Sequence, residues 1–579
     1  MCITGALVTG CSNSGDKDVT ENAIRNEEDE TLQGRIDYQF SGNDADTPGY
    51  AEGTITFTCN TEGMYRLYWS DDKAALEGYY EIAEFELGSS NDSQSVCFEY
   101  HTAIPVDAKK IIAVSATDKD DALTVENAVA VFEIPESKQL GYTSEDVLYT
   151  FNSFSDIHID EEHWGSTPAY WWEYSESHWA QALDYATKMD VDFIVSSGDQ
   201  VTNASLENLD KEWQAFQYIL SQSDYVNPIY ESGGNHEIRQ DGAVEEELKK
   251  FMIGTGLDHN METLQENKPY YSIIEPNTGD LFIFMALEAG YRPAEYDEFT
   301  EEQLNWVEDL LEENYDKGKN IYVIQHALMS GYGPGDDVDN PYYSGSIDSS
   351  LESAKKFQSI LESYPDIIWI SGHSHEAFEL GYNYSNDNGN ACNMIHNSSV
   401  GNPTHITEGV IDYTFNEGLS QGYFVQAFEN AIIFSGANLC DQKIYPAYSY
   451  IIDGTTSKLE EQEQTTEPEK SQVEETEAEE EADIEITGGN IRSVVTNANT
   501  VLGVHYEYSS YNQYQELKKL YYQYKDVDAD ALSKEERTQI YEVFGEKIEE
   551  LYNTVLTVEK IAANEPIVEE NQEAVEENQ

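Results

Sequence analysis

Apolar and polar residues alternate with a period of two in the first part of the chain. Between residues 54 and 59, Ile55, Phe57 and Cys59 alternate with threonines, as they do in a half-buried strand. Four more short apolar runs follow, separated by clusters of Asp, Asn and Gly, at residues 64–69, 95–100, 111–115 and 128–134. Several short strands at this spacing predict a β-sandwich of the immunoglobulin or fibronectin type over residues 35–140.

The next part of the chain has a different pattern, because apolar strands are interleaved with helical segments. The strand-like runs lie at residues 147–155, 191–196, 228–231, 281–287, 321–324 and 367–370, with later ones at 423–428, 431–434 and 448–452. Thr300 and Gln303 form a capping box in front of one helical segment. This alternation predicts a layered α/β domain over residues 145–453, in which the late strands complete a second sheet.

A polar run separates this domain from the end of the chain. Residues 457–487 are rich in Glu, Gln and Thr, a composition that cannot form a core and predicts a disordered linker. Ser533 and Glu536 then form a second capping box within a predicted helical hairpin over 505–564, which precedes an acidic tail over 565–579. Such a hairpin needs close packing of its own or a partner, and the expected partner is a protein that the sequence does not identify. We expect the linker to prevent a core shared with the α/β domain.

The charge of the chain excludes several functions. Its 579 residues carry a formal net charge of −81. Nucleic-acid phosphates and anionic lipid surfaces demand Lys and Arg, so neither is an expected partner of the folded surface. Apolar residues still make up 39% of the chain, which is enough for sizeable cores and excludes wholesale disorder. No apolar run approaches the ~18 residues of a membrane helix.

The N-terminal residues resemble an export signal. Val8, Thr9 and Gly10 precede Cys11 as in a bacterial lipobox, in which the cysteine becomes lipidated and N-terminal. This resemblance predicts an exported protein, anchored to the cell membrane by lipid or extracellular, with residues 1–34 as signal and polar tether. The chain has no Lys or Arg before Cys11, whereas a signal peptide has a basic start. The alternative is a disordered N-terminus.

Six cysteines are present, and four remain when the two near the N-terminus are set aside. An even number in an exported chain permits two disulfides, most simply Cys59–Cys97 and Cys392–Cys440. The alternative is four buried thiols. No Cys-x-x-Cys pair occurs, so a cysteine-based zinc ribbon is not expected.

The residues that carry chemistry follow the apolar strands of the middle part, where α/β folds place their ligand groups. In chain order these blocks are Asp156-Ile157-His158, Gly198-Asp199, Gly234-Asn235-His236-Glu237, His326, and Gly372-His373-Ser374-His375. Of the 12 histidines in the chain, five fall in these blocks. The pattern therefore concentrates metal-binding side chains at strand ends.

Carboxylate, imidazole and amide groups suit Mn, Fe or Zn, and the absence of Cys argues against a purely structural zinc. The candidate ligands are Asp156, His158, Asp199, Asn235, His326, His373 and His375. Seven are too many for one open catalytic site and suffice for two metal ions that share a bridging carboxylate. A pair ~3.5–4 Å apart can hold a bridging hydroxide and polarise a phosphoryl oxygen.

These blocks, in this order, resemble the pattern of the calcineurin-like metallophosphoesterases. The resemblance implies a four-layer α/β/β/α sandwich and attack of metal-bound hydroxide on a phosphate ester. It implies that the first metal is held by Asp156, His158, Asp199 and His375. It implies that the second is held by Asn235, His326, His373 and again Asp199, which bridges. His236 is then the catalytic residue that faces the substrate, and Glu237 is structural.

The N-terminal β-domain resembles, less specifically, that of purple acid phosphatases. That subfamily has Gly where His158 stands and a Tyr ligand where this chain has Thr202. These two departures from the subfamily's pattern imply a colourless enzyme without the ferric–divalent pair. Arg239, three residues beyond His236, is a candidate phosphate clamp; a surface ion pair is the alternative. His396 is a candidate donor near the metals, or a satisfied buried histidine.

Together these observations predict a metallophosphoesterase at the bacterial cell surface, with an N-terminal β-sandwich and a C-terminal helical appendage. Its expected cofactors are two divalent or trivalent ions of Mn, Fe or Zn, and its expected substrate is a phosphorylated small molecule. One alternative is a phosphodiesterase or nucleotide hydrolase instead of a monoesterase. The other is a non-catalytic surface adhesin or scaffold.

Overall fold

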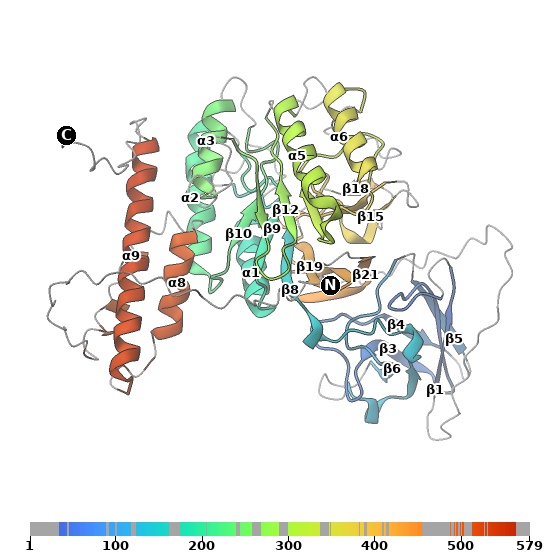
Figure 1. Ribbon diagram of the computed structural model, residues 1–579. Helices are drawn as coiled ribbons and strands as arrows, with labels where there is room; N and C mark the ends of the chain where they lie inside the picture. Colours follow the sequence, from blue (N-terminus) through green and yellow to red (C-terminus); the bar gives the residue numbers. More distant parts are fainter. Residues whose placement is uncertain are drawn as a thin grey trace, which may run out of the picture.

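A computed structural model describes most of residues 34–453 and part of the C-terminal region (Figure 1). Within 34–453 the exceptions are residues 43–45, 89–91, 99–100, 117–122, 161–173, 204, 239–243, 257–267, 289–298, 336–346, 348, 381–382, 387–390, 408–409 and 413–415. Beyond 453 the described residues are 487, 491–492, 494–495, 498, 501–502, 512–525, 527, 529 and 531–562. The predicted tether up to residue 33, the linker up to residue 486, the acidic tail, Cys11 and Arg239 lie outside the described residues.

The N-terminal part folds into two antiparallel sheets with the strand orders β1-β2-β5 and β4-β3-β6-β7. The strands are β1 (Gly34–Phe40), β2 (Gly53–Cys59), β3 (Gly63–Ser70), β4 (Ala83–Leu87), β5 (Asp92–Phe98), β6 (Lys110–Ser115) and β7 (Ala130–Glu133). Alternate side chains such as Ile55, Leu67 and Ile111 are fully buried in one core that both sheets share. The period-two pattern therefore predicted this β-rich region correctly.

Two six-stranded sheets form the centre of the molecule, with the orders β10-β9-β8-β19-β20-β21 and β11-β12-β13-β14-β16-β15. Strands β8, β9 and β10 run parallel, as do β12, β13, β14 and β16. The strands are β8 (Tyr149–Phe154), β9 (Phe193–Ser196), β10 (Ile229–Glu231), β11 (Tyr271–Ile274), β12 (Leu281–Phe284), β13 (Ile321–Ile324), β14 (Ile368–Ser371), β15 (Tyr384–Ser385), β16 (Asn393–His396), β19 (Gln421–Ala427), β20 (Ala431–Asn438) and β21 (Lys443–Asp453). A separate hairpin joins β17 (His405–Thr407) to β18 (Val410–Asp412).

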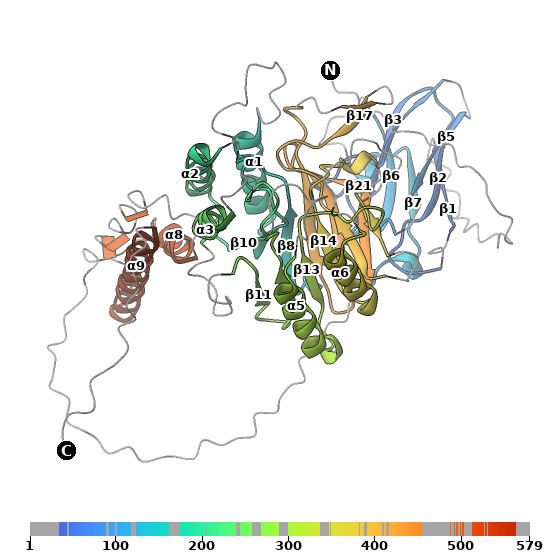
Figure 2. The same cartoon turned by 90° about the horizontal axis from the view of Figure 1, so that it is seen from above.

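Helices cover the outer face of each sheet, which produces four layers (Figure 2). The first sheet is covered by α1 (Ser175–Lys188), α2 (Leu206–Gln222) and α3 (Val244–Gly254), and the second by α5 (Glu301–Asn314) and α6 (Glu352–Ser363). In β12, Phe282 and Phe284 enter the core between the sheets, whereas Leu281 and Ile283 pack in the core that contains α5 and α6. Both faces of such strands are buried, which is why their sequences are continuous apolar runs. The predicted α/β/β/α fold class is confirmed. The expectation that the late strands complete a second sheet was wrong, because β19 pairs with β8 and extends the first sheet together with β20 and β21.

One of the predicted capping boxes is only half formed. Gln303 donates its backbone N–H to Thr300 Oγ1 (3.2 Å), but its side chain does not return to Thr300. Instead Gln303 Oε1 accepts from the backbone N–H of Ala286 (3.0 Å) and Nε2 donates to the Ala286 carbonyl (2.9 Å). The buried glutamine therefore ties the start of α5 to the end of β12.

The β-domain is joined to the first sheet at its edge strand β21. Isolated bridges connect Tyr79 to Ile444 and Thr102 to Tyr450, and the Tyr80 N–H donates to the Ile444 carbonyl (2.9 Å). Figures 1 and 2 both place the blue β-domain beside the orange strand β21. The contact covers part of an edge strand, and pairing of this kind is one way in which proteins protect such edges.

The C-terminal part contains the predicted helical hairpin, formed by α8 (Asn512–Tyr524) and α9 (Lys534–Ala562). The capping box in front of α9 is complete, since Glu536 N–H donates to Ser533 Oγ (3.2 Å) and Ser533 N–H donates to Glu536 Oε2 (2.7 Å). Described residues between 491 and 502 are also helical and complete the core of this C-terminal module. No helix in the described part of the chain combines the length and apolar character needed to cross a membrane.

The C-terminal module packs on the α/β domain. The Lys518 ammonium of α8, only 2% exposed, donates to the carbonyls of Leu220 (2.9 Å), Ser223 and Tyr225 (3.3 Å) at the end of α2. Ile253 of α3 packs against the core of the module, and both views show α8 beside α2 and α3. The module keeps a hydrophobic core of its own, separate from the core between the two sheets, and it docks on α2 and α3 through these contacts.

No disulfide joins any of the four described cysteines. The β2–β5 register places Cys97 opposite Thr54, so Cys59 lies five positions further along β2, at about 17 Å. Cys392 is buried in the core under α5 and α6, whereas Cys440 follows β20 on the first sheet. Both expected disulfides were therefore wrong. The alternative of four buried thiols holds only in part, because Cys59 and Cys392 are buried whereas Cys97 and Cys440 are partly exposed.

Candidate metal centre

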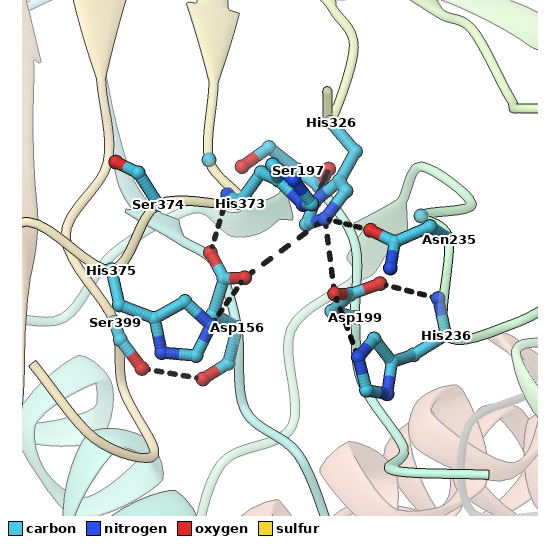
Figure 3. Close-up of polar contacts among 12 residues, drawn as sticks. Asp156, Ser197, Asp199, Asn235, His236, His326, His373, Ser374, His375 and Ser399 are labelled. Carbon is cyan, nitrogen blue, oxygen red and sulfur yellow. Dashed lines mark hydrogen bonds and ion pairs between the residues drawn. The ribbon is translucent and has the colours of Figure 1, made fainter. Parts of the chain in front are cut away.

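All seven candidate ligands lie at the carboxyl ends of parallel strands. Asp156 and His158 follow β8, Asp199 follows β9, Asn235 follows β10, His326 follows β13, and His373 and His375 follow β14. Parallel strands end at the same edge of a sheet, and the two sheets are packed face to face. The structure therefore brings all seven side chains together. Figure 3 labels six of them, all except His158, and shows His236 beside Asp199.

Five of these seven residues have a left-handed backbone. The φ angle is +54° at Asp156 and His158, +56° at Asp199, +59° at His375 and +79° at His373. Such angles are uncommon for residues with a Cβ and cost of order 1–3 kcal/mol each. Strain of this size persists only where the surrounding structure enforces it, and it clusters at functional sites. The turns after β8, β9 and β14 therefore hold their side chains against local preference.

The first group of ligands contains Asp156, His158 and His375. Nε2 of His375 lies 3.1 Å from Asp156 Oδ1 and 3.1 Å from Nε2 of His158. Nε2 of His158 is 3.7 Å from the same Asp156 oxygen. Two imidazole nitrogens and one carboxylate oxygen thus point at a common position, as ligands of a borderline divalent cation do.

The second group contains Asp199, Asn235, His326 and His373. Nε2 of His326 lies 3.0 Å from Asp199 Oδ2 and 3.1 Å from Asn235 Oδ1. The same Asp199 oxygen is 3.7 Å from Nε2 of His158, so this carboxylate lies between the two groups. That is the place a bridging ligand must occupy.

Two cations fit this set of donors. The Asp and His ligand atoms of each group all lie within 4.8 Å of one another. Nδ1 of His373 is buried without a hydrogen-bond partner among the described residues. Burial opposes ionisation of Asp156 and Asp199, yet the surrounding histidines, among them His326, hold the pKa of both carboxyls below the usual range. Buried carboxylates that stay ionised require positive charge close by, and two cations held by these residues would supply it.

Backbone carbonyls orient the ligand imidazoles. Nδ1 of His326 lies 3.1 Å from the Ser197 carbonyl, and Nδ1 of His375 lies 3.1 Å from the Asn402 carbonyl. A neutral imidazole that donates from Nδ1 keeps Nε2 as a metal ligand, so these carbonyls fix both tautomer and ring direction. The sequence carries no signal for them, because every residue has a carbonyl.

Glu237 ties together the loops around the bridging carboxylate. Its two oxygens accept hydrogen bonds from the backbone N–H groups of Gly234 (2.7 Å), Asp199 (3.0 Å) and Gln200 (2.8 Å). The side chain is 1% exposed and contacts the loops rather than the space between the ligands. This arrangement matches the structural role that the resemblance implied for it.

His396 supports the loop that carries His373 and His375. Its Nε2 lies 2.9 Å from Ser374 Oγ and 3.0 Å from the Gly372 carbonyl. Burial lowers the pKa of His396 to about 4, so the imidazole is neutral near pH 7. His396 therefore holds the loop and does not belong to either ligand group.

Two glycines of the motifs are required by close approach of the ligands. A Cβ on Gly198 would lie 2.7 Å from Nδ1 of His326, and one on Gly234 would lie 2.2 Å from Oδ1 of Asp199. Cβ atoms essentially never approach other heavy atoms closer than 3.0 Å. The turns can pass next to the ligands only because these positions have no side chain.

His236 lies beside the bridging carboxylate. Its backbone N–H donates to Asp199 Oδ1 (2.8 Å), and its Nδ1 lies 2.7 Å from the Thr202 carbonyl. Nε2 is the nitrogen that faces the ligands, 4.0 Å from Asp199 Oδ2, and the side chain is 13% exposed. The Thr202 carbonyl was not foreseen from the sequence, where Thr202 was notable only as a missing tyrosine.

A family model described as calcineurin-like phosphoesterase matches residues 150–377. This range contains both ligand groups and His236. Residues 150–377 are therefore a calcineurin-like phosphoesterase domain, of a family that depends on two metal ions. This domain is that of a metallophosphoesterase, a hydrolase of phosphoesters.

Several solved structures resemble the chain at low sequence identity. A dimetal phosphatase from Danio rerio is 13% identical with a TM-score of 0.39, covering 53% of this chain and 100% of that one. The purple acid phosphatase PPD1 from yellow lupin (Lupinus luteus) is 13% identical with a TM-score of 0.36, covering 73% and 74%. The NAD nucleotidase of Haemophilus influenzae is 12% identical with a TM-score of 0.28, covering 53% and 49%. No curated protein matches the chain by sequence.

Proposed function

We propose that the protein hydrolyses phosphate monoesters of small molecules with two metal ions of Mn, Fe or Zn. The observation that carries this proposal is the position of Asp199 between the two ligand groups. Its Oδ2 lies 3.7 Å from His158 on one side and 3.0 Å from His326 on the other. One carboxylate shared by two cations is the arrangement of a dinuclear phosphoryl-transfer site.

In this proposal each ion has four protein ligands. The first is held by Asp156, His158, Asp199 and His375. The second is held by Asp199, Asn235, His326 and His373. When bound, the two ions polarise a phosphoryl oxygen and activate the attacking water.

His236 is the proposed proton donor to the departing alkoxide. Its Nδ1–H remains on the Thr202 carbonyl, so Nε2 is the nitrogen available to exchange a proton with the substrate. Charge stabilisation on the phosphoryl oxygens is the competing role, and the two differ in their dependence on the leaving group.

The test begins with metal dependence. Chelation should abolish hydrolysis of p-nitrophenyl phosphate, and Mn, Fe or Zn should restore it. Asp199→Ala should lose activity and bind fewer than two ions per chain, because both ions share this carboxylate. The control is Asp72→Ala, an acidic residue whose side chain is 60% exposed in the β-domain, which should behave like wild type. Full activity of metal-stripped Asp199→Ala would overturn the proposal.

A second assay separates monoesters from diesters. We expect kcat/KM for p-nitrophenyl phosphate to exceed that for bis-p-nitrophenyl phosphate. The reverse order would assign the protein to the phosphodiesterases or nucleotide hydrolases. Arg239 is the proposed phosphate clamp, on sequence grounds alone, and Arg239→Ala should raise KM for the monoester more than Arg239→Lys does, because Arg pairs bidentately with phosphate.

We also propose export to the bacterial cell surface with a lipid anchor on Cys11. Support comes from the small residues before Cys11 and the polar segment after it. Cys11→Ser should move the protein from the membrane fraction of its native host to the soluble exported fraction. Wild-type protein found wholly in the cytosol would disprove this location.

A further inference from the structure

Asn203 follows the loop of the bridging ligand and is held in an unusual way. Its φ angle is +48°, and its side chain is fully buried. Its backbone N–H donates to Oε2 of Glu212 in α2 (2.6 Å), and its Nδ2 donates to Oε1 of Glu247 in α3 (2.5 Å). Both glutamates have no exposed surface. One carboxylate from each of the two helices therefore accepts a hydrogen bond from Asn203 in the loop after β9.

The peptide plane before Asn203 orients the ring of His236. The Thr202 carbonyl accepts from His236 Nδ1 (2.7 Å), and this carbonyl shares its rigid plane with the Asn203 N–H. The Glu212 carboxylate therefore fixes the N–H of a peptide group, and the carbonyl of the same peptide group fixes the His236 imidazole. Thr202 is also fixed by its Oγ1, which donates to the His158 carbonyl (3.2 Å).

This arrangement is expensive in free energy. A left-handed backbone at a residue with a Cβ costs roughly 1–2 kcal/mol. Burial of a carboxylate is also unfavourable unless hydrogen bonds compensate. Packing between α2 and α3 needs no such groups, because apolar residues of similar volume join helices at lower cost. The cost therefore points to a role in the neighbouring site.

We propose that Asn203, gripped by Glu212 and Glu247, is a positioning residue for His236. The three residues fix the Thr202–Asn203 peptide so that its carbonyl holds the His236 Nδ1–H and Nε2 faces the substrate. The inference rests on the proposed function of His236 as proton donor. If the three residues served only to join α2 and α3 to the loop, their loss would reduce every reaction of the enzyme equally.

The leaving group distinguishes these roles. Proton donation contributes ~10²–10⁴-fold for a poor leaving group and little for a good one. Glu212→Leu should therefore lose at least about 10-fold more kcat/KM on an alkyl phosphate than on p-nitrophenyl phosphate. Glu212→Gln keeps an acceptor oxygen for the Asn203 N–H and should restore most of the difference. Asn203→Gly tolerates the left-handed backbone. Like Glu212→Leu, it should lose more kcat/KM on the alkyl phosphate than on p-nitrophenyl phosphate.

The double variants provide the decisive comparison. In the His236→Ala background, Glu212→Leu and Asn203→Gly should have no further effect on the ratio between the two substrates, because the group they position is gone. Metal content should remain at two ions per chain in the single variants. These outcomes together support the proposal.

Two controls exclude indirect effects. Glu275 is 5% exposed and accepts from the Thr278 N–H (2.6 Å) just before β12, at the edge of the second sheet opposite the metal ligands. Glu275→Leu therefore removes a buried glutamate that grips a turn without touching the site, and the substrate ratio should not change. Gln442→Gly relieves a left-handed backbone (φ +53°) after β20 and should leave the ratio unchanged.

The failures are distinguishable. If His236→Ala is selective for the leaving group but Glu212→Leu and Asn203→Gly lose both substrates equally, the positioning role is overturned and the proton donor stands. If His236→Ala itself loses both substrates equally, the donor role falls and the inference falls with it. If Glu212→Leu does not fold, the same outcomes are decided by Asn203→Gly alone.

Discussion

Gly234→Ala tests whether the packing of the turns sets the metal ligands. The new Cβ would lie 2.2 Å from Asp199 Oδ1 and 2.8 Å from Cδ2 of His326, whereas Cβ contacts below 3.0 Å essentially never occur. The Asp199 carboxylate would have to retreat by about 0.8 Å. Metal–ligand distances tolerate only about 0.2 Å. The substitution therefore displaces the carboxylate proposed to bind both ions without removing any ligand.

The expected consequence is a large catalytic defect with a modest loss of stability. A displacement approaching 1 Å can cost about 10²-fold in rate, so kcat/KM for p-nitrophenyl phosphate should fall by roughly 100-fold. Overpacking typically costs about 1–3 kcal/mol. Metal content, measured by elemental analysis of purified protein, should fall below two ions per chain.

Two matched glycines separate the collision from other effects of adding a methyl group. Gly78 has φ +79°, and nothing lies within 4 Å of a Cβ added there. Gly78→Ala should therefore lower the free energy of unfolding by roughly 1–2 kcal/mol through backbone strain alone and keep both metals. Gly545 in α9 also has nothing within 4 Å, and Gly545→Ala should gain about 0.5–1 kcal/mol. If Gly234→Ala retains two ions and activity within about threefold of wild type, the reasoning is refuted.

Three further predictions follow from other parts of the molecule. Burial lowers the pKa of Lys518 from 10.5 to about 8. Between these values the unfolded chain binds more protons than the folded one, so the free energy of unfolding should rise from pH 8 toward pH 10. Lys518→Met should remove up to about 3 kcal/mol of this rise in denaturant titrations, whereas substitution of its exposed neighbour, Lys519→Met, should keep it. Truncation after Asp453 removes the contacts of the C-terminal module with α2 and α3 and should lower the melting temperature of the catalytic domain by about 2–4 °C for each kcal/mol of net docking energy. An unchanged melting temperature would show that the docking contributes nothing. The metal-loaded enzyme should be colourless, because Thr202 stands where a tyrosine would bind iron, and a strong visible absorption band would contradict this.

Much of the fold follows from local pattern. Runs such as residues 321–324 and 367–370 became β13 and β14, because strands buried on both faces need continuous apolar sequence. Strand β4 was not predicted, since Phe85 and Leu87 alternate there with glutamates, which are weak strand formers. The helical residues described between 491 and 502 were not predicted; their apolar side chains, such as Ile491 and Ala498, pack in the core of the C-terminal module.

The identity and order of the candidate ligands were also decided by the sequence alone. Asp, Asn and His at the ends of parallel strands converge in any α/β fold, whatever the details of packing. The nature of the side chains then restricts the chemistry to borderline metals. For this reason the metal centre could be expected before any distance between its atoms was known.

Only the tertiary structure decided how the site is held. The left-handed turns at the ligands, the carbonyls of Ser197 and Thr202 that orient imidazoles, and the grip of Glu212 on the Asn203 peptide all depend on packing. The docking of Lys518 on α2 and the lack of the expected disulfides belong to the same class. A periodic pattern shows which face of a strand or helix is buried. Contacts between residues hundreds of positions apart depend on how those faces pack against one another, and the local sequence does not determine that packing.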